Sequence, residues 1–157
     1  MSLRQIRSVS EFYSFAIAIE REAISTYSGF AERMEALGNT ETAELFREIA
    51  RQEAGHAQEL ERCADGFRLG DALAMSAPST SITPDGTEIA FESLDPRGAV
   101  EVAMNAERRA LSFYQNVSLT SPDAAVRELA EGMILEEFEH LRLLERLSLR
   151  LGGTANH

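Results

Sequence analysis

The sequence predicts an all-α protein, a four-helix bundle in which two antiparallel hairpins are joined by a long crossover. Three observations support this fold class. In four long segments the apolar residues recur at spacings of three and four, as on one face of an amphipathic helix. Start and stop signals for helices bound each segment, and the stretch between the second and third segments lacks helical periodicity. The expected helices cover about residues 9–37, 41–64, 96–119 and 122–151, with the crossover at about 66–94 and residues 1–157 forming a single domain.

The first two helices are bounded by recognisable capping residues. Ser8 followed by Glu11 resembles a capping box, and Gly38 is a suitable end for the first helix. Thr40 is a suitable cap for the second helix, which is expected to end before Asp65-Gly66. Because few residues separate these helices, they should pack as an antiparallel hairpin. The inward-facing residues are Phe12, Ala16, Glu20, Ala23, Tyr27, Ala31 and Met34 in the first helix and Leu45, Ile49, Glu53, His56 and Leu60 in the second.

The third and fourth helices are expected to begin where a proline follows a capping side chain. Asp95-Pro96 starts the third helix, and Ser121-Pro122 repeats the signal for the fourth, which should end before Gly152-Gly153. The crossover before them is rich in Gly, Pro, Ser and Thr, with a short extended piece expected at residues 88–91. The inward-facing residues are Val100, Ala103, Glu107, Ala110, Tyr114 and Val117 in the third helix and Val126, Leu129, Met133, Glu137, His140, Leu144 and Leu147 in the fourth.

Two of the three histidines close the same four-residue motif, Glu53-Ala54-Gly55-His56 and Glu137-Phe138-Glu139-His140. A Glu and a His three residues apart project from one face of a helix. A second repeated phrase precedes each motif, from Glu20 to Tyr27 in one half and from Glu107 to Tyr114 in the other. A single Glu-x-x-His is weak evidence, but two at the same offset after matched glutamates are hard to reach by chance. Four Glu and two His from four helices form the ligand set of a dinuclear carboxylate site.

The repeated glutamates interrupt apolar stripes that should face the bundle axis. A buried, ionised carboxylate without a partner costs several kcal/mol or more. Basic partners are scarce, because the chain has no Lys and its Arg residues mostly fall on outward positions. Two divalent cations would bring the charge of four carboxylates to zero. Carboxylate oxygen with imidazole nitrogen suits iron or manganese, and zinc or cobalt can also occupy such sites. The expected metal ligands are Glu20, Glu53, His56, Glu107, Glu137 and His140.

Three further residues have a position that bears on the site. Tyr27 and Tyr114 each lie seven residues after the lone Glu, two turns along the same helix face. Each hydroxyl is expected to hydrogen-bond a ligand carboxylate; the alternatives are a core aromatic and an electron donor. Cys63 excludes an internal disulfide and any cysteine-based zinc or iron–sulfur site within one chain, and it is expected to be a small buried residue.

The composition narrows the classes of partner and compartment. A formal net charge of −11 argues against nucleic acid and anionic membranes, because phosphate binding needs a basic face. The short apolar run at residues 15–19 leads directly into Glu20 with no cleavage site, so no signal peptide is expected. No segment is apolar enough over a sufficient length to span a bilayer. The sequence therefore predicts a cytoplasmic protein.

At these residues the sequence resembles the rubrerythrin-like branch of the ferritin-like superfamily. The matching elements are Glu20 with Tyr27, Glu53-x-x-His56, Glu107, and Glu137-x-x-His140. The resemblance implies a diiron centre in a four-helix bundle that reacts with hydrogen peroxide or dioxygen while ferrous iron is oxidised. Glu20 and Glu53 with His56 would chiefly serve one ion, and Glu107 and Glu137 with His140 the other.

The sequence departs from that family's pattern in two respects. Rubrerythrins carry a rubredoxin-like domain built from Cys pairs, whereas this chain has one Cys. Electrons would then come from a separate donor protein or from ferrous iron itself. Rubrerythrins also carry an extra carboxylate on the third helix, a turn from the main ligand. The positions one turn from Glu107 are Ala103, Met104, Ala110 and Leu111, none of them acidic, which leaves a six-ligand site.

The resulting hypothesis is a diiron peroxidase or ferroxidase that acts in oxidative-stress defence or iron handling. Three alternatives stay open: a ferritin-like assembly that stores iron, a manganese or mixed-metal oxidase, and a helical module without metal. A homo-oligomer, most simply a dimer, is expected because the fourth helix has a second apolar face that a bundle interior cannot also bury. That face consists of Ile134, Leu135, Phe138 and Leu141.

Overall fold

The computed structural model describes residues 5–64 and 93–155, and for residues 153–155 only the backbone. This part of the chain contains four α-helices and no strand, which confirms the predicted fold class. The helices are α1 (Val9–Ala36), α2 (Thr40–Cys63), α3 (Pro96–Thr120) and α4 (Ala124–Ala155). Within the described residues, no helix combines the length and the apolar character that crossing a membrane requires.

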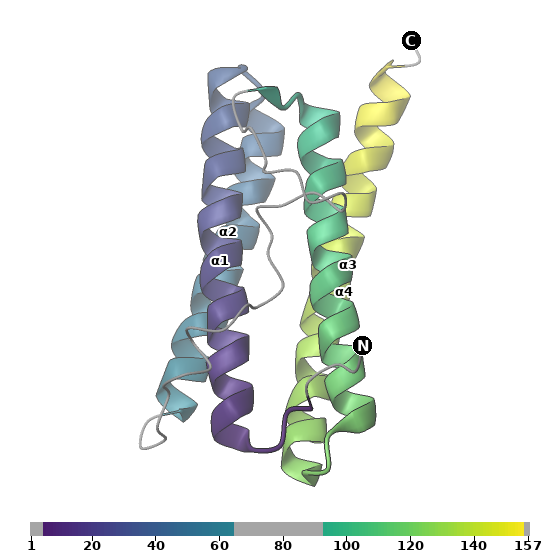
Figure 1. Ribbon diagram of the computed structural model, residues 1–157. Helices are drawn as coiled ribbons and strands as arrows, with labels where there is room; N and C mark the ends of the chain where they lie inside the picture. Colours follow the sequence, from purple (N-terminus) through teal and green to yellow (C-terminus); the bar gives the residue numbers. More distant parts are fainter. Residues whose placement is uncertain (1–4, 65–92, 156–157) are drawn as a thin grey trace.

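The helices form two hairpins that lie side by side. Helix α1 packs along α2, and α3 packs along α4 (Figure 1). Helices α1 and α4 run in one direction, while α2 and α3 run in the other, so α2 ends and α3 begins at opposite ends of the bundle (Figure 1). The predicted crossover, including the extended piece at residues 88–91, falls outside the described residues and stays a prediction.

The termini of the first hairpin follow from short-range hydrogen bonds. The Ser8 hydroxyl caps α1 by accepting the backbone N–H of Glu11 at 3.1 Å. Gly38 follows the helix with φ of 77°, a left-handed conformation that glycine adopts without steric cost. The predicted cap of α2 was wrong: Asn39, not Thr40, is the capping residue, and its side-chain oxygen accepts a first-turn N–H at 3.1 Å. The side-chain amide oxygen of Asn39, one residue earlier than expected, therefore accepts the first-turn N–H that the Thr40 hydroxyl was expected to accept.

The second hairpin begins as predicted but continues differently. Asp95 caps α3, its carboxylate accepting a backbone N–H at 2.7 Å, and Pro96 occupies the first turn. The fourth helix was expected to start at Ser121-Pro122, and this was wrong. Helix α4 begins at Ala124, because Asp123 is the capping residue: its carboxylate accepts two N–H groups of the first turn. The predicted end near residue 151 was also wrong. The helix runs to Ala155, since a glycine pair lowers helix propensity without removing a backbone donor.

Side-chain-to-backbone hydrogen bonds connect the two hairpins at both ends. At one end the Ser121 hydroxyl donates to the carbonyl of Ile6 at 2.6 Å, and Ile6 itself is buried. At the other end Arg33 of α1 donates through Nε to the carbonyl of Leu94, just before α3, at 3.0 Å. We define the first contact as the Ser121 latch and the second as the Arg33 latch. Each latch ties one end of α1, or the chain before it, to the partner hairpin.

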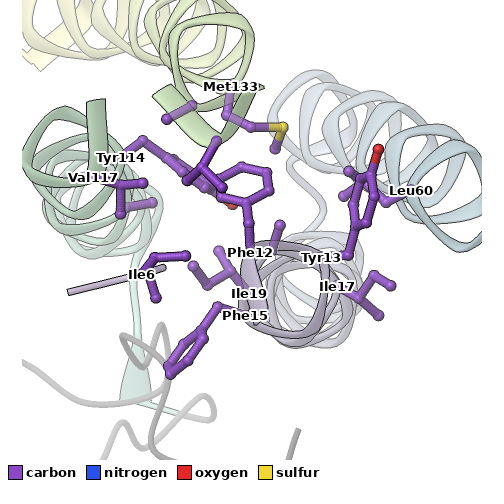
Figure 2. Packing of buried hydrophobic residues seen from close by; sticks show 14 of the residues in the cluster. Ile6, Phe12, Tyr13, Phe15, Ile17, Ile19, Leu60, Tyr114, Val117 and Met133 are labelled. Carbon is purple, nitrogen blue, oxygen red and sulfur yellow. The ribbon is translucent and has the colours of Figure 1, made fainter. Parts of the chain in front are cut away.

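The apolar core is divided into two clusters along the bundle axis. One contains Phe12 and Tyr114, whose ring centroids lie 6.1 Å apart; Figure 2 shows Phe12 near its centre and Tyr13 beside Leu60. The other contains Phe30 and Phe46, with ring centroids 5.2 Å apart. Burying each such side chain contributes about 1.5–3 kcal/mol. Between the clusters lies a polar layer.

Most inward-facing residues were predicted correctly, and those of α1 and α3 are all buried. In α2, Leu45 and His56 are only partly buried, and Phe46 and Ala57 are buried in addition. In α4, Leu129 is only partly buried. At these points the buried residue is the neighbour of the predicted one. Such an offset is expected when a helix with 3.6 residues per turn is approximated by spacings of three and four.

Two surface predictions need correction. Cys63, expected to be buried, is exposed as the last residue of α2, where its thiol donates to a Glu59 carboxylate oxygen at 3.6 Å. On α4, Leu135 and Phe138 are 70% and 45% exposed, as the predicted partner surface requires. Leu141, however, is buried and Ile134 is partly buried, because both pack toward the bundle. The exposed apolar surface is thus narrower than predicted.

Candidate metal centre

The structure brings all six predicted ligand residues together in the polar layer between the two core clusters. Their donor atoms form two groups, within each of which the atoms lie no more than 4.8 Å apart. Glu53 belongs to both groups, which makes its carboxylate the link between them. The first group is Glu20, Glu53 and His56, and the second is Glu53, Glu107, Glu137 and His140.

Burial differs between the two groups. The four glutamates are 0–4% exposed and His140 is 1% exposed. The His56 side chain, by contrast, is 27% exposed. The second group is therefore closed to solvent, whereas the first group opens to solvent at its histidine.

His140 is fixed by contacts on both ring nitrogens. Its Nδ1 lies 2.7 Å from Glu53 Oε1 and 3.7 Å from Glu107 Oε1. Its Nε2 lies 3.1 Å from the side-chain oxygen of Gln52, which can only accept a hydrogen bond. A proton on Nε2 then donates to Gln52 and leaves Nδ1 directed at the carboxylates. Such outer hydrogen bonds set the tautomer and orientation of ligating histidines. No motif or spacing in the sequence pointed to Gln52.

His56 faces a carboxylate that the sequence analysis missed. Its Nδ1 lies 3.9 Å from Glu20 Oε2 but only 3.3 Å from Glu136 Oε2. The rings of His56 and His140 are 6.0 Å apart between centroids and inclined by 29°. Glu136 directly precedes the inward-facing Glu137, and a residue one position away points about 100° around the helix. The stripe that contains Glu137 therefore gave no reason to expect Glu136 at the site, although its long side chain reaches His56.

Burial and the mutual proximity of the glutamates shift their pKa values in different directions. The pKa of Glu20 is raised well above its ordinary value by burial and by the nearby carboxyl groups of Glu53 and Glu107. The pKa of Glu137 is raised well above its ordinary value by burial and by Glu107. Without a metal ion, these two carboxyl groups therefore keep their protons to higher pH than an exposed carboxyl group does.

Glu107 and His140 are shifted in the direction of their charged forms. Burial acts to raise the pKa of Glu107, but interactions with Glu137, His140 and Tyr27 outweigh burial and lower the pKa. Burial acts to lower the pKa of His140, yet the carboxylates of Glu107 and Glu53 raise the pKa to about 10. The metal-free cluster therefore contains an imidazolium held between carboxylates.

The two tyrosines differ in their contacts, despite their matched positions in the repeat. The Tyr27 hydroxyl donates to Glu107 Oε1 at 2.5 Å and so crosses from the first hairpin to the second. Tyr114 is fully buried, and among the described residues its hydroxyl has no hydrogen-bond partner. Its pKa is raised well above the ordinary value by burial and then by Glu20. Only Tyr27 thus orients a carboxylate of the site.

Several buried donor atoms of the cluster have no hydrogen-bond partner among the described residues. They are both oxygens of Glu20, Glu53 Oε1, the Nδ1 atoms of His56 and His140, and Glu136 Oε2. His140 Nδ1 and Glu53 Oε1 are close but are not aligned as a hydrogen bond. Leaving such an atom unsatisfied typically costs about 1–3 kcal/mol. Divalent cations bound among these atoms would satisfy them, so the residues fit a dinuclear metal site.

Comparisons with known proteins agree with this arrangement. The model of the rubrerythrin family matches residues 11–148. The crystal structure of an uncharacterised conserved protein from Magnetospirillum magnetotacticum MS-1 is similar, with a TM-score of 0.73, 28% sequence identity, and coverage of 91% of this chain and 95% of that one. No curated protein matches the sequence.

The structure is also similar to the bacterioferritin of Rhodobacter capsulatus, which was solved with a metal-free dinuclear site and haem iron. The TM-score is 0.64 at 23% identity, with 92% of this chain and 88% of that chain covered. At this identity the likeness supports the fold alone.

Proposed function

Because the chain belongs to the rubrerythrin family, we propose that it is a diiron oxidoreductase that reduces hydrogen peroxide or dioxygen while ferrous iron is oxidised. The observation that carries the proposal is the pair of donor groups that share Glu53 and draw on all four helices. A site for one ion would not need a second, fully formed group of carboxylate and imidazole donors beside the first.

The donor set supports iron as the metal. Carboxylate oxygens with imidazole nitrogens suit iron and manganese, and the described part of the site includes no thiolate that would favour softer ions. Glu20, Glu53 and His56 would hold one ion, and Glu53, Glu107, Glu137 and His140 the other. When bound, two ferrous ions supply the two electrons that cleavage of an O–O bond in peroxide consumes.

The chain's own residues would position the ions and manage protons. Tyr27 holds Glu107 in one orientation through its hydroxyl, and Gln52 does the same for His140. The raised pKa values of Glu20 and Glu137 favour their protonated forms in the metal-free cluster, and these protons are released on metal binding because a carboxylate must be ionised to bind a cation strongly. The partly exposed His56 marks the side from which a small oxidant would reach the site.

The electrons have to be replaced after each turnover. We propose that ferrous iron itself, or a separate electron-donor protein, supplies them. The single cysteine of the chain is not enough to build a cysteine-based iron centre.

Stopped-flow oxidation of anaerobically iron-loaded protein by hydrogen peroxide tests the proposal. Wild-type protein is expected to oxidise ferrous iron faster than free ferrous iron at equal concentration. Glu53→Ala and Glu137→Ala should slow this reaction more than about 100-fold, because loss of an outer partner alone typically costs about 10–100-fold. Tyr27→Phe removes only such an outer partner and should fall within that smaller range.

The matched control is Glu139→Ala, a change on the same helix at a side chain that is 66% exposed. It should react like wild type. If Glu137→Ala oxidises iron as fast as this control, the site does not work as proposed. Metal analysis of protein purified without added metal decides between iron and manganese.

A further inference from the structure

Glu136 approaches the candidate site from the side where His56 is open to solvent. Its side chain is 37% exposed, but its Oε2 atom is buried and lacks a hydrogen-bond partner among the described residues. The same is true of His56 Nδ1, which lies 3.3 Å from that oxygen. Two unsatisfied donor atoms of metal-binding type thus face each other beside the first donor group.

The distance between these atoms fits two ligands of a single ion. Imidazole nitrogen and carboxylate oxygen typically lie about 2.0–2.2 Å from a divalent transition metal. Two ligand atoms at that radius, separated by an angle of about 90–110°, lie about 3.0–3.5 Å apart. The 3.3 Å separation is within this range. Glu136 is not among the donors that already lie within 4.8 Å of one another, so its carboxylate would have to move toward Glu20 and Glu53 to share their ion.

The first donor group has fewer ligands than the second, and α3 does not compensate. The first donor group comprises three residues, and the second comprises four. The residues one turn from Glu107 on α3 are Ala103, Met104, Ala110 and Leu111, which offer no carboxylate. On α4, by contrast, Glu136 and Glu137 are adjacent, and each faces a different donor group.

We propose that Glu136 is a seventh metal ligand of the chain, which completes the coordination of the ion held by Glu20, Glu53 and His56. This inference rests on the proposed dinuclear site and adds a carboxylate to it. Since the Glu136 side chain is partly exposed, it is the ligand of that ion best able to swing away and leave a coordination position for the oxidant.

Anaerobic titration with Co²⁺, followed by calorimetry and by visible absorption, tests the role of Glu136. Wild-type protein should bind two ions per chain. Glu136→Gln should bind one ion as wild type does and the other about 10–100-fold more weakly, a range typical when a metal site loses a supporting group. Its absorption should change for that ion only, because cobalt spectra depend on coordination number. Glu139→Gln, at an exposed position one turn away, should match wild type in both readouts.

The outcomes separate this inference from the proposed function. If Glu136→Gln and Glu139→Gln give the same two affinities and the same spectrum as wild type, Glu136 is not a ligand, while the dinuclear site stands. If wild-type protein binds no Co²⁺, the dinuclear site and the inference both fail. Should Glu136→Gln not fold, the structure of cobalt-loaded wild type decides. A Glu136 oxygen within about 2.5 Å of an ion supports the inference, and a distance beyond about 3.5 Å overturns it.

Discussion

Glu20, Glu137 and His140 all have raised pKa values in the metal-free protein, so each keeps its proton to higher pH than the same group does in water. The pKa values of the two carboxyl groups are raised chiefly by burial, and neighbouring carboxylates raise the pKa of His140 to about 10 despite its burial. Each of these residues must lose a proton before it can act as a metal ligand. Metal binding and proton release are therefore linked in this site.

We expect the affinity for divalent cations to rise with pH across the neutral range. Protons compete with the cations for Glu20, Glu137 and His140, and this competition weakens as pH increases. Calorimetry of Co²⁺ binding in buffers with different ionisation enthalpies should reveal net release of more than one proton per chain. Heats that do not depend on the buffer would contradict the expectation.

We expect Glu20→Gln to stabilise the metal-free protein. A raised carboxyl pKa means that the contribution of Glu20 to folding is fully present below the ordinary pKa and is lost as pH rises through the raised pKa. Glutamine cannot ionise, so it avoids this loss at neutral and alkaline pH. Avoiding the cost of either protonating this group or burying its charge should be worth about 1–4 kcal/mol, the range typical when buried charged groups are replaced.

Thermal unfolding of metal-free protein measures the effect. At about 2–4 °C per kcal/mol for a chain of this size, the Tm should rise by several degrees. The gain should shrink as pH falls toward the ordinary carboxyl pKa, and Co²⁺ should stabilise the variant less than wild type. A lower Tm for Glu20→Gln than for Glu139→Gln at pH 8 would show that burial is not the dominant cost.

The spacing of the motifs was sufficient to predict that six residues lie together in the candidate site, but not the further contacts of that site. The two Glu-x-x-His motifs and their matched upstream glutamates lie on inward faces because helix geometry places residues three and four apart together. Gln52 and Glu136 each directly precede one of these residues. Their side chains reach the site through length and flexibility, which periodicity does not encode.

Helix termini were harder to predict than helix faces. Before α4, Ser121 offers a hydroxyl and Asp123 a carboxylate, and either side chain is a plausible N-cap. Asp123 became the cap, since its Oδ1 accepts N–H groups at 2.8 and 3.2 Å, while the Ser121 hydroxyl donates to Ile6 instead. Competition between a local cap and a contact distant in sequence decided the boundary.

We expect Asp123→Ala to destabilise the protein by about 1 kcal/mol, within the range of about 0.5–2 kcal/mol for a lost N-cap. The free energy of unfolding from urea titration measures this loss. Glu128→Ala, at an exposed position farther along α4, is the control and should change stability by no more than about 0.5 kcal/mol. Equal stabilities of the two variants would mean that Asp123 does not cap the helix in solution.

The arrangement of the whole molecule was largely predictable from connection lengths. Short connections within hairpins and a long one between them indicated two antiparallel pairs, and the described helices form such pairs (Figure 1). The width of the exposed apolar surface on α4 was not predictable. Whether Leu141 is covered depends on how closely the hairpins pack, and the sequence does not state that distance.

We expect the protein to form a homodimer through the α4 surface around Leu135 and Phe138. These side chains are 70% and 45% exposed, and exposed neighbouring apolar side chains commonly mark a contact between subunits. Sedimentation at micromolar concentration should give twice the mass of one chain. Leu135→Glu combined with Phe138→Glu should give a monomer, whereas Leu119→Glu, at an exposed leucine on α3, should not change the mass. A monomeric wild type would contradict the expectation.

The two latches give the hairpins a fixed separation at each end of the bundle. Ser121, in the connection between α3 and α4, is hydrogen-bonded to Ile6 in the chain before α1. Arg33 of α1 is hydrogen-bonded to Leu94, just before α3. Because the second donor group takes Glu53 from one hairpin and its other members from the other, its dimensions depend on that separation. The hydrogen bonds at the two ends of the bundle thus help to set the distances between the donor residues of the two hairpins midway along it. Loosening either latch would change the dimensions of the second donor group, which draws on both hairpins, without touching any of its members.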